Sequence, residues 1–337
     1  MTQYGIISLA DHLPHPTTRV SSPQGVRLAE MLDAAVTAEQ LGFHSYGVGE
    51  HHFGNYIMPA PELMLAWLAG RTERIKLGTS VSLLANLDPL RFAEQLAVLD
   101  QLTHGRAEVT FARGASLATT QAFGLADFDE VRPRFDEGLR LVLRLLTEES
   151  VDWQGAFRSD LQGITIQPRP LQQPYPTIWV GGGLSEISAR LAAELGLPLL
   201  LPSLFRWPED YREIIELYER HHAAAGHQHA SRVGFPSYVH CAPTSQHARQ
   251  RWRPHLEHYQ RFASSIRGSH GRPTDFDSLL TGPAVCGSPA EVVDRLGGIN
   301  ELLGLDRHLL LMDVGALPHE LVGESMALVA DELGLSS

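Results

Sequence analysis

Residues 38–53 read AEQLGFHSYGVGEHHF, and this stretch carries the pattern that decides the fold. The chain leaves a segment with helical spacing, enters a β-rich run at 45–49 and then presents the polar group Glu50-His51-His52. Strands that are separated by helices indicate parallel βαβ units, because a parallel neighbour needs a long crossover connection. The stretch therefore predicts one repeat of an α/β fold, with polar side chains where a strand ends.

The same alternation continues almost from one end of the chain to the other. We expect eight strands, at 4–9, 45–49, 75–82, 107–112, 177–181, 197–201, 233–240 and 308–313. Apolar residues at helical spacing occupy the segments between them, as at Phe92, Leu96 and Leu99. Eight strands joined by right-handed helical crossovers favour a closed barrel over an open sheet. We predict an α/β fold of one (β/α)8 TIM barrel.

Two stretches are longer than the repeat requires. The first, at about 148–176, contains a turn around Gly155 and many prolines from Pro168 onward, so it predicts a hairpin and an extended connector. The second, at about 260–287, is polar and contains glycines. Loops of this length in compact domains are usually functional lids or disordered segments. We expect a single domain over residues 1–337, with insertions after strands 4 and 7.

Composition limits the classes of function. Hydrophobic residues make up 43% and charged residues 20% of the 337 residues, which indicates a soluble globular protein and excludes wholesale disorder. The net charge of -12 argues against a chain that mainly binds nucleic acid or an anionic membrane, although a local phosphate site stays open.

The expected compartment follows from the cysteines and from missing targeting signals. Cys241 and Cys286 are too few for a disulfide framework, and neither belongs to a CxxC pair. The first residues lack the basic and apolar regions of a signal peptide, and no run approaches the roughly 18 apolar residues of a membrane span. We expect a soluble, cytoplasmic protein.

Candidate site residues follow four successive predicted strands. In a barrel of this kind the active site lies at the C-terminal ends of the strands, so these residues become neighbours. They are Glu50-His51-His52, Thr79-Ser80-Val81, Arg113-Gly114 and the run from Gly181 through Gly182 and Gly183 to Ser185. We therefore predict one polar site at one end of the barrel.

The glycine run is the clearest local signal within this set. Glycines between a strand and a helix let the backbone approach an anion, and a helix N-terminus offers unpaired N–H groups. Ser185 could cap that helix or donate to a phosphate, and Arg113 on the adjacent strand can grip a phosphate with two hydrogen bonds. The run matches neither GxxxxGK[ST] nor GxGxxG. A tight turn without ligand and an ion-paired arginine are the competing interpretations, and we favour a phosphate site.

The histidines call for separate interpretations. If strand geometry continues, His51 and His52 point in opposite directions, so at most one faces the barrel mouth. A neutral histidine there suits acid/base or hydrogen-bonding work, whereas a buried structural histidine is the competing interpretation. Asp11, His12 and Asp313 could line the same mouth or form caps and turns. We interpret four histidines near the end of a predicted surface helix as solvated: His221, His222, His227 and His229.

Together these motifs resemble the bacterial-luciferase-like flavin-dependent monooxygenases. The segments that carry the resemblance lie at 38–43, 50–53, 77–79, 88–89, 99–102, 105–106, 113–114, 176–182, 287–289 and 315–320. They cover most of the chain in order. The resemblance implies a TIM barrel, usually a homodimer, that binds FMN at its C-terminal mouth and uses O2 on a small organic substrate. No dinucleotide fingerprint is visible, so we expect a separate reductase to supply reduced FMN.

The resemblance also implies roles for single residues. The FMN phosphate would be held by Arg113, Gly182, Gly183 and Ser185. Ser80-Val81 falls where the family often has a non-prolyl cis peptide under the flavin ring. His51 falls on the family's catalytic histidine, with Glu50 and His52 beside it. The insertion after the seventh strand corresponds to a mobile lid in the luciferases.

Two residues depart from the family pattern. Ala112 stands where luciferase-type enzymes can carry a reactive cysteine, and Gly182 replaces a carboxylate found in some members. Both weaken a prediction of light emission or of long-chain aldehyde use.

Three competing functions stay open at this point. A deazaflavin-dependent hydride-transfer enzyme shares this barrel, although Arg113-Gly114 looks closer to the FMN branch. The second is a flavin-binding protein without catalysis, and the third is a metal-dependent hydrolase on the same fold.

Overall fold

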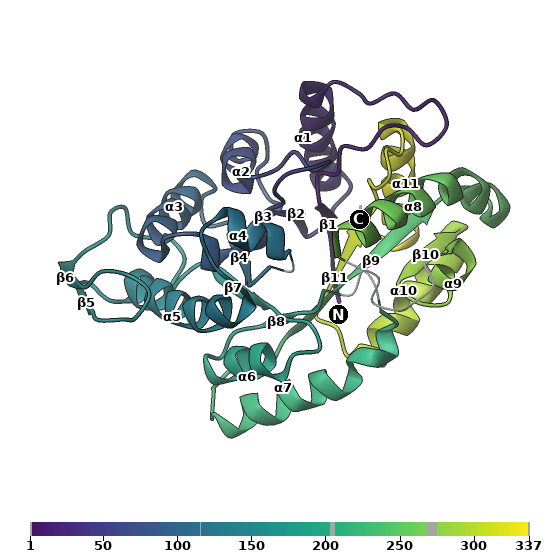
Figure 1. Ribbon diagram of the computed structural model, residues 1–337. Coiled ribbons are helices and arrows are strands. Elements are labelled where there is room, and N and C mark those ends of the chain that lie inside the picture. The colour runs from purple at the N-terminus through teal and green to yellow at the C-terminus, as the bar shows by residue number, and fades with distance from the viewer. Residues whose placement is uncertain (1, 115, 203–205, 268–274, 336–337) are drawn as a thin grey trace.

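The computed structural model describes residues 2–114, 116–202, 206–267 and 275–335. Parallel strands at its centre form a closed barrel surrounded by helices, which confirms the predicted α/β TIM barrel (Figure 1). In order around the wall, the barrel strands are β1 (Gln3–Ser8), β2 (Ser45–Val48), β3 (Lys76–Leu83), β4 (Ala107–Ala112), β7 (Thr177–Gly181), β8 (Leu199–Leu200), β9 (Val233–Cys241) and β11 (Arg307–Leu311). The wall closes because β9 pairs with β8 as well as with β11.

A ninth parallel strand, β10 (Ala284–Gly287), was not among the predicted ones. It pairs with the second half of β9, where Tyr238 lies opposite both Ala284 and Leu311. Since Tyr238 has a neighbour on each side, β10 and β11 flank β9 on opposite edges. The predicted insertion at 260–287 therefore contains elements that the sequence did not indicate, since its end is a strand and it also contains α9 (Phe276–Leu280). Residues 268–274 of that stretch lie outside the described residues.

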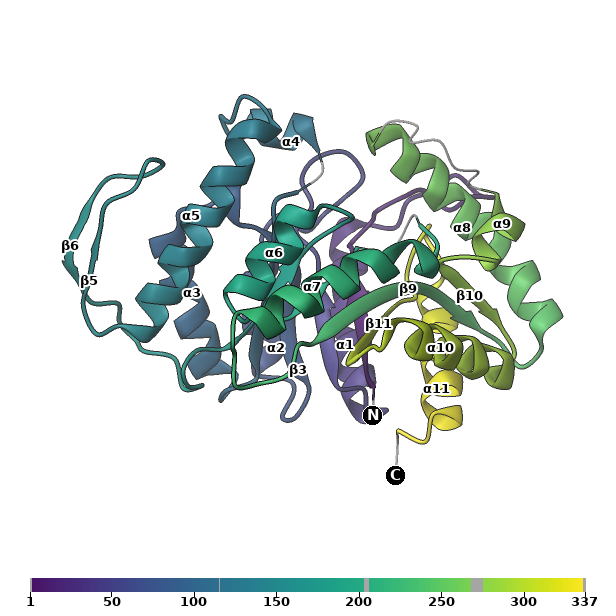
Figure 2. The ribbon, with the colours of Figure 1, turned by 90° about the horizontal axis from the view of Figure 1, so that it is seen from below.

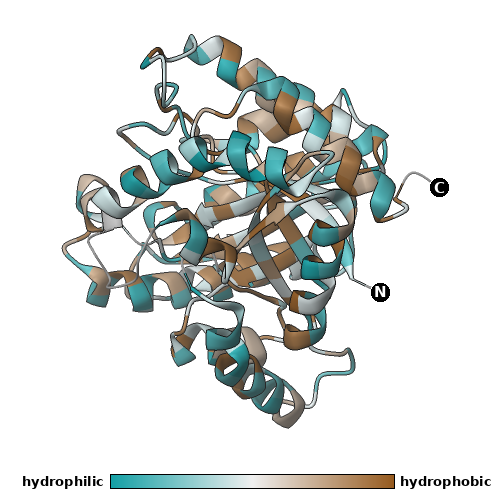
Figure 3. Cartoon of the chain, turned by 90° about the vertical axis from the view of Figure 1, so that its right-hand side faces the viewer, coloured by the Kyte–Doolittle hydropathy of each residue, from teal (hydrophilic) through white to brown (hydrophobic). Residues whose placement is uncertain are grey.

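Helices cover the barrel wall, and local sequence explains where they begin. The larger ones are α1 (Gln24–Gln40), α2 (Pro61–Ala69), α3 (Pro89–Leu102), α5 (Phe128–Thr147), α6 (Glu186–Glu194), α7 (Arg212–Ala224), α8 (Ser245–Arg267), α10 (Pro289–Leu303) and α11 (His319–Glu332). At the start of α3 the Asp88 carboxylate accepts a hydrogen bond of 2.9 Å from the Arg91 N–H, and Pro89 occupies the first turn. Apolar residues gather on the strands and on the helix faces that cover them (Figure 3).

The predicted hairpin is present as β5 (Val151–Trp153) and β6 (Leu161–Ile164), which pair antiparallel at the side of the barrel (Figure 1). The connector that follows is fastened to α3 by the buried Asp100. Its carboxylate accepts hydrogen bonds from the backbone N–H groups of Leu171 (2.7 Å) and Gln172 (2.9 Å). A buried carboxylate that is fully engaged in this way fixes an otherwise extended segment. The description of the chain as one domain stays a prediction.

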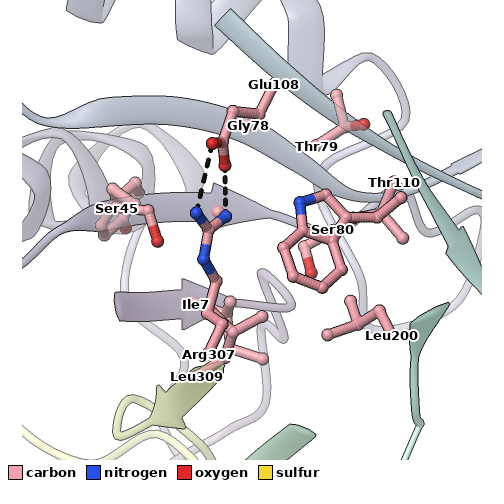
Figure 4. A pocket seen from close by; sticks show the side chains of 13 residues that line it. Ile7, Ser45, Gly78, Thr79, Ser80, Glu108, Thr110, Leu200, Arg307 and Leu309 are labelled. Atoms are coloured by element: carbon pink, nitrogen blue, oxygen red, sulfur yellow. Dashed lines mark hydrogen bonds and ion pairs between the residues drawn. The ribbon is translucent and has the colours of Figure 1, made fainter. Parts of the chain in front are cut away.

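The barrel is closed at the N-terminal ends of its strands by a buried ion pair (Figure 4). Arg307 at the start of β11 donates to both carboxylate oxygens of Glu108 in β4, and its guanidinium lies 4.9 Å from the Trp179 ring. A cavity of about 20 Å³ beside the pair is large enough for about one water molecule. The charges at this floor are thus satisfied within the protein, and the open end lies opposite.

Two further observations concern the chain as a whole. Cys241 and Cys286 are both buried and free. Among the described helices, none is both long and apolar enough to cross a lipid bilayer.

Candidate functional site

The open end of the barrel holds a cavity of about 370 Å³. This volume falls in the range of roughly 300–1,000 Å³ that is typical of small-molecule sites. Its walls come from the C-terminal ends of the strands, from α4 (Leu117–Ala122) and from α8. Figure 2 shows α4 at the end of the barrel away from the two chain termini. The predicted site residues that line the cavity are Glu50, His51, His52, Ser80, Val81, Arg113, Gly114, Gly181 and Gly183.

The peptide bond between Ser80 and Val81 is cis, as the resemblance implies. It lies within β3, and the register between β3 and β4 shifts between Ser80 and Ser82. Both residues of the bond line the cavity. The irregularity therefore forms part of the cavity wall between two otherwise regular parallel strands.

Glu50 connects the end of β2 to the end of β3, just after this bond. Its backbone N–H donates to the Val81 carbonyl at 2.9 Å, and its Oε2 accepts from the Leu83 N–H at 2.8 Å. Its other oxygen, Oε1, lies 2.7 Å from Nε2 of His52. Glu50 is only 4% exposed, and a buried carboxylate requires such partners. Both carboxylate oxygens are thus engaged by the chain itself, which gives Glu50 the geometry of a positioning residue.

His51 and His52 both line the cavity, so the prediction that at most one of them faces it was wrong. The physical reason is that β2 ends at Val48, and strand alternation does not extend to the histidines. Phe53 even has a φ of 66°, in the left-handed region. The His51 ring stacks on Tyr56 with centroids 4.1 Å apart. Each histidine is therefore oriented by its own neighbour rather than by the pleat of a strand.

Tyr56 and the residues of α8 are lining or supporting groups that the sequence did not reveal. The Tyr56 hydroxyl lies 3.2 Å from that of Tyr259 in α8, and Ala263 of the same helix lines the cavity. Tyr56 comes only four residues after the His51-His52 pair. This closeness to a polar motif was the sequence feature that could have identified Tyr56 as a site residue. Tyr259 lies about two hundred residues away and gave none.

Arg113 directly follows β4 and is half-buried at the cavity. Within the part of the chain that the structure describes, no carboxylate pairs with its guanidinium. Burial lowers the pKa of Arg113, and the like charge of Arg132 in α5 lowers it further. A partly desolvated cation beside a second cation is unfavourable unless an anion joins them. This corner of the cavity therefore fits an anionic group such as a phosphate.

The residues of the glycine run differ in whether they line the cavity. Gly183 lines the cavity, whereas Gly182 and Ser185 do not. A side chain at Gly182 would meet Ser188 of α6 and Leu199 of β8 at about 3 Å, so this glycine permits close packing of strand and helix. Ser185 occupies the N-cap position of α6 but makes no side-chain capping hydrogen bond. Of the predicted run from Gly181 to Ser185, Gly181 and Gly183 are the described residues that reach the cavity.

Two further interpretations are corrected. Asp11, His12 and Asp313 do not line this cavity but a separate one of about 170 Å³, where the Arg27 guanidinium lies 2.7 Å from the Asp313 carboxylate. Burial raises the pKa of the neighbouring Asp11 to about 7. Of the four histidines interpreted as solvated, His222 is buried at 4% exposure.

Comparison with known proteins decides the family. The family model described as luciferase-like monooxygenase matches residues 2–307. The chain belongs to this family. Its members are monooxygenases or oxidoreductases. Among the described side chains, no group of three or more His, Cys, Asp or Glu residues could hold a metal ion.

Relatives within the family differ in cofactor. The structure of the monooxygenase RslO1 from Streptomyces bottropensis is 32% identical, with a TM-score of 0.87 over 98% of both chains. The oxygenase component of flavin-dependent trigonelline monooxygenase from Acinetobacter baylyi is 31% identical over 45% of this chain and 42% of that protein. The F420-dependent glucose-6-phosphate dehydrogenase of Kineococcus radiotolerans is 34% identical over 46% of this chain and 47% of that protein. The chain also spans about half (48% and 46%) of the length of two curated relatives from Sinorhizobium fredii.

Replacing Glu50 tests its connecting role. In Glu50→Ala the buried Leu83 N–H and the His52 ring both lose their acceptor, so we expect the free energy of unfolding to fall by about 1–3 kcal/mol in urea denaturation. Glu50→Gln keeps one acceptor oxygen and should lose less. The exposed Glu219→Ala serves as the control, within about 0.5 kcal/mol of wild type. Equal stability of Glu50→Ala and Glu219→Ala would contradict the role.

Proposed function

We propose that the chain is the oxygenase of a two-component monooxygenase, which takes reduced FMN from a separate flavin reductase and uses O2 to oxygenate a small organic substrate. One observation carries this proposal. Arg113 lies at a cavity of about 370 Å³ with no carboxylate partner among the described residues. The trigonelline relative, itself named an oxygenase component, supports the separate reductase.

The residues at the cavity fit FMN. Arg113 and the Gly183 backbone would hold its phosphate, with the charge of Arg132 adding to the attraction. Ser80 and Val81 would lie against the ring system. Gly182 and Ser185 are proposed to shape the loop rather than to touch the phosphate.

The chain's own residues would orient the reactants and exclude water. Reduced FMN, when bound, supplies the electrons that activate O2. The apolar walls keep water from the reacting groups. A ring nitrogen of His51 would hold or transfer a proton there, and its stacking on Tyr56 fixes the plane of the ring. Glu50 would act through His52, by keeping the second imidazole in place.

We also propose the assembly and the compartment of the chain. Four apolar side chains on the neighbouring helices α2 and α3 are largely exposed: Leu63 (75%), Trp67 (45%), Val98 (42%) and Leu102 (49%). An exposed apolar face of this kind suits association with a second copy. The free thiols of Cys241 and Cys286 fit the reducing cytoplasm.

FMN titration of wild type and Arg113→Ala tests the cofactor. A charge-assisted hydrogen bond contributes about 1.5–3 kcal/mol, so the variant should bind FMN about 10- to 100-fold more weakly in either redox state. Arg91→Ala, an exposed arginine of α3, is the control and should bind like wild type. Absence of FMN binding in both redox states contradicts the proposal, and binding of F420 in its place would identify a hydride-transfer enzyme.

The proton-handling role of His51 has its own test. His51→Ala should keep its FMN affinity while product formation with O2 falls about 10²- to 10⁴-fold, as for loss of a general acid or base. The exposed His247→Ala is the control. Equal losses of FMN affinity and turnover would make His51 structural, and absence of any O2-dependent product in wild type would favour a non-catalytic flavin carrier.

Association is measured by sedimentation velocity at micromolar concentration. We expect a wild-type dimer that Trp67→Glu converts to monomer, since a buried unpaired carboxylate opposes the contact. Leu302→Glu, which places the same charge on α10, should leave the dimer intact. A wild-type monomer would refute the proposed homodimer.

A further inference from the structure

We infer that the substrate is an uncharged, largely apolar compound with a flat aromatic part, and that this part stacks on Phe53 and Phe123 at the cavity mouth. The inference rests on the proposed function, because it assigns the substrate to the part of the cavity that FMN leaves free. It is carried by the charges of the cavity, by the composition of its walls and by two exposed aromatic rings.

The charged groups of the cavity are already engaged. Both carboxylate oxygens of Glu50 accept hydrogen bonds from, or lie against, groups of the chain, at 2.7 Å from His52 and 2.8 Å from the Leu83 N–H. Arg113 would be occupied by the FMN phosphate. Among the described lining residues, the cavity then offers a substrate no fixed charge of either sign. A carboxylate or ammonium group on the substrate would lose its hydration without gaining a partner, which is strongly unfavourable.

The walls favour an apolar body. Ten of the described lining residues are aliphatic or proline, among them Leu9, Leu83, Leu201, Pro236 and Ala263. They come from the strands and loops on several sides of the cavity and from α8. Transfer of apolar surface from water to such walls gives roughly 25 cal/mol per Å² buried, so binding energy here comes from shape and apolar area.

Two aromatic rings lie next to the cavity, beside His52, without being among its lining residues. Phe53 is 58% exposed and Phe123 is 43% exposed, and their rings stack with centroids 6.5 Å apart. Both rings contact His52, at 5.7 Å and 4.7 Å between centroids, and His52 itself lines the cavity. His52 thus joins the cavity wall to two partly exposed aromatic side chains. We call Phe53 and Phe123 the aromatic rim.

The backbone at the rim points to function. Phe53 has a φ of 66°, a conformation that bulky residues rarely adopt, and such outliers concentrate at ligand-binding sites. Aromatic rings prefer offset or edge contacts at about 4.5–7 Å, so a flat ring of a ligand can add to the existing stack. The contact of both rings with His52, which lines the cavity, favours a ligand over a protein as the occupant.

The test compares 2-naphthol with 2-naphthoate, which share a ring system and differ in charge near neutral pH. FMN binding is recorded first, and both probes are then titrated into the FMN-loaded protein by calorimetry. We expect saturable 2-naphthol binding, with 2-naphthoate at least about 10-fold weaker. Phe53→Ala and Phe123→Ala should each weaken 2-naphthol binding about 3- to 10-fold with unchanged FMN affinity. Leu171→Ala, on the connector, is the matched control, because the exposure of Leu171 lies between those of Phe53 and Phe123.

The outcomes separate the two proposals. If FMN does not bind, the proposed function fails and this inference fails with it. If FMN binds and the two probes bind equally, or 2-naphthol does not bind, the inference is overturned while the proposed function stands. If Phe123→Ala leaves 2-naphthol affinity intact but alters the sedimentation coefficient or the reductase-coupled rate, the rim is a protein contact, and the inference is likewise overturned.

Discussion

The open end of the barrel depends on one buried carboxylate. Glu50 ties the end of β2 to β3 through hydrogen bonds to Val81 and Leu83, just after the cis peptide, and its remaining oxygen lies against His52. Parallel strands are held to each other by backbone hydrogen bonds, and beyond Val48, where β2 ends, the last of these to β3 is the one from the Glu50 N–H to the Val81 carbonyl. The Glu50 side chain adds a further bond to the Leu83 N–H. The histidines that follow can therefore leave strand geometry while the chain just before them stays fixed to β3.

The two ends of the barrel differ in whether a buried or half-buried arginine has a carboxylate partner. At the floor, Glu108 and Arg307 neutralise each other in a site with room for about one water molecule. At the mouth, Arg113 has no carboxylate partner within the described residues and feels the repulsion of Arg132. The same chemical group is structural where its partner is supplied by the chain and available for binding where it is not. This asymmetry separates the stabilising end of the fold from the end that faces ligands.

The local sequence pattern predicted the barrel strands, but it did not predict β10, the orientation of the two histidines or the contact made by Tyr259. Hydrophobic periodicity located the barrel strands, and the resemblance placed the cis bond at Ser80-Val81. The four-residue β10 was missed because it lies in a polar stretch and pairs with only half of β9. His51 and His52 were misassigned because alternation was extended beyond the strand. Tyr259 could not be found, since its approach to Tyr56 depends on how α8 crosses the mouth.

The pairing of β9 has a consequence for how such a barrel can diverge. Its first residues close the wall with β8, and only its later residues pair with β10. The segment between β9 and β10, which includes α8, thus begins after the residues of β9 that close the barrel wall. Its length and composition can change over evolutionary time without opening the wall. Ala263 of this segment borders the cavity. Substitutions in the segment can therefore change this side of the cavity while the strand ends on the other sides keep their sequence.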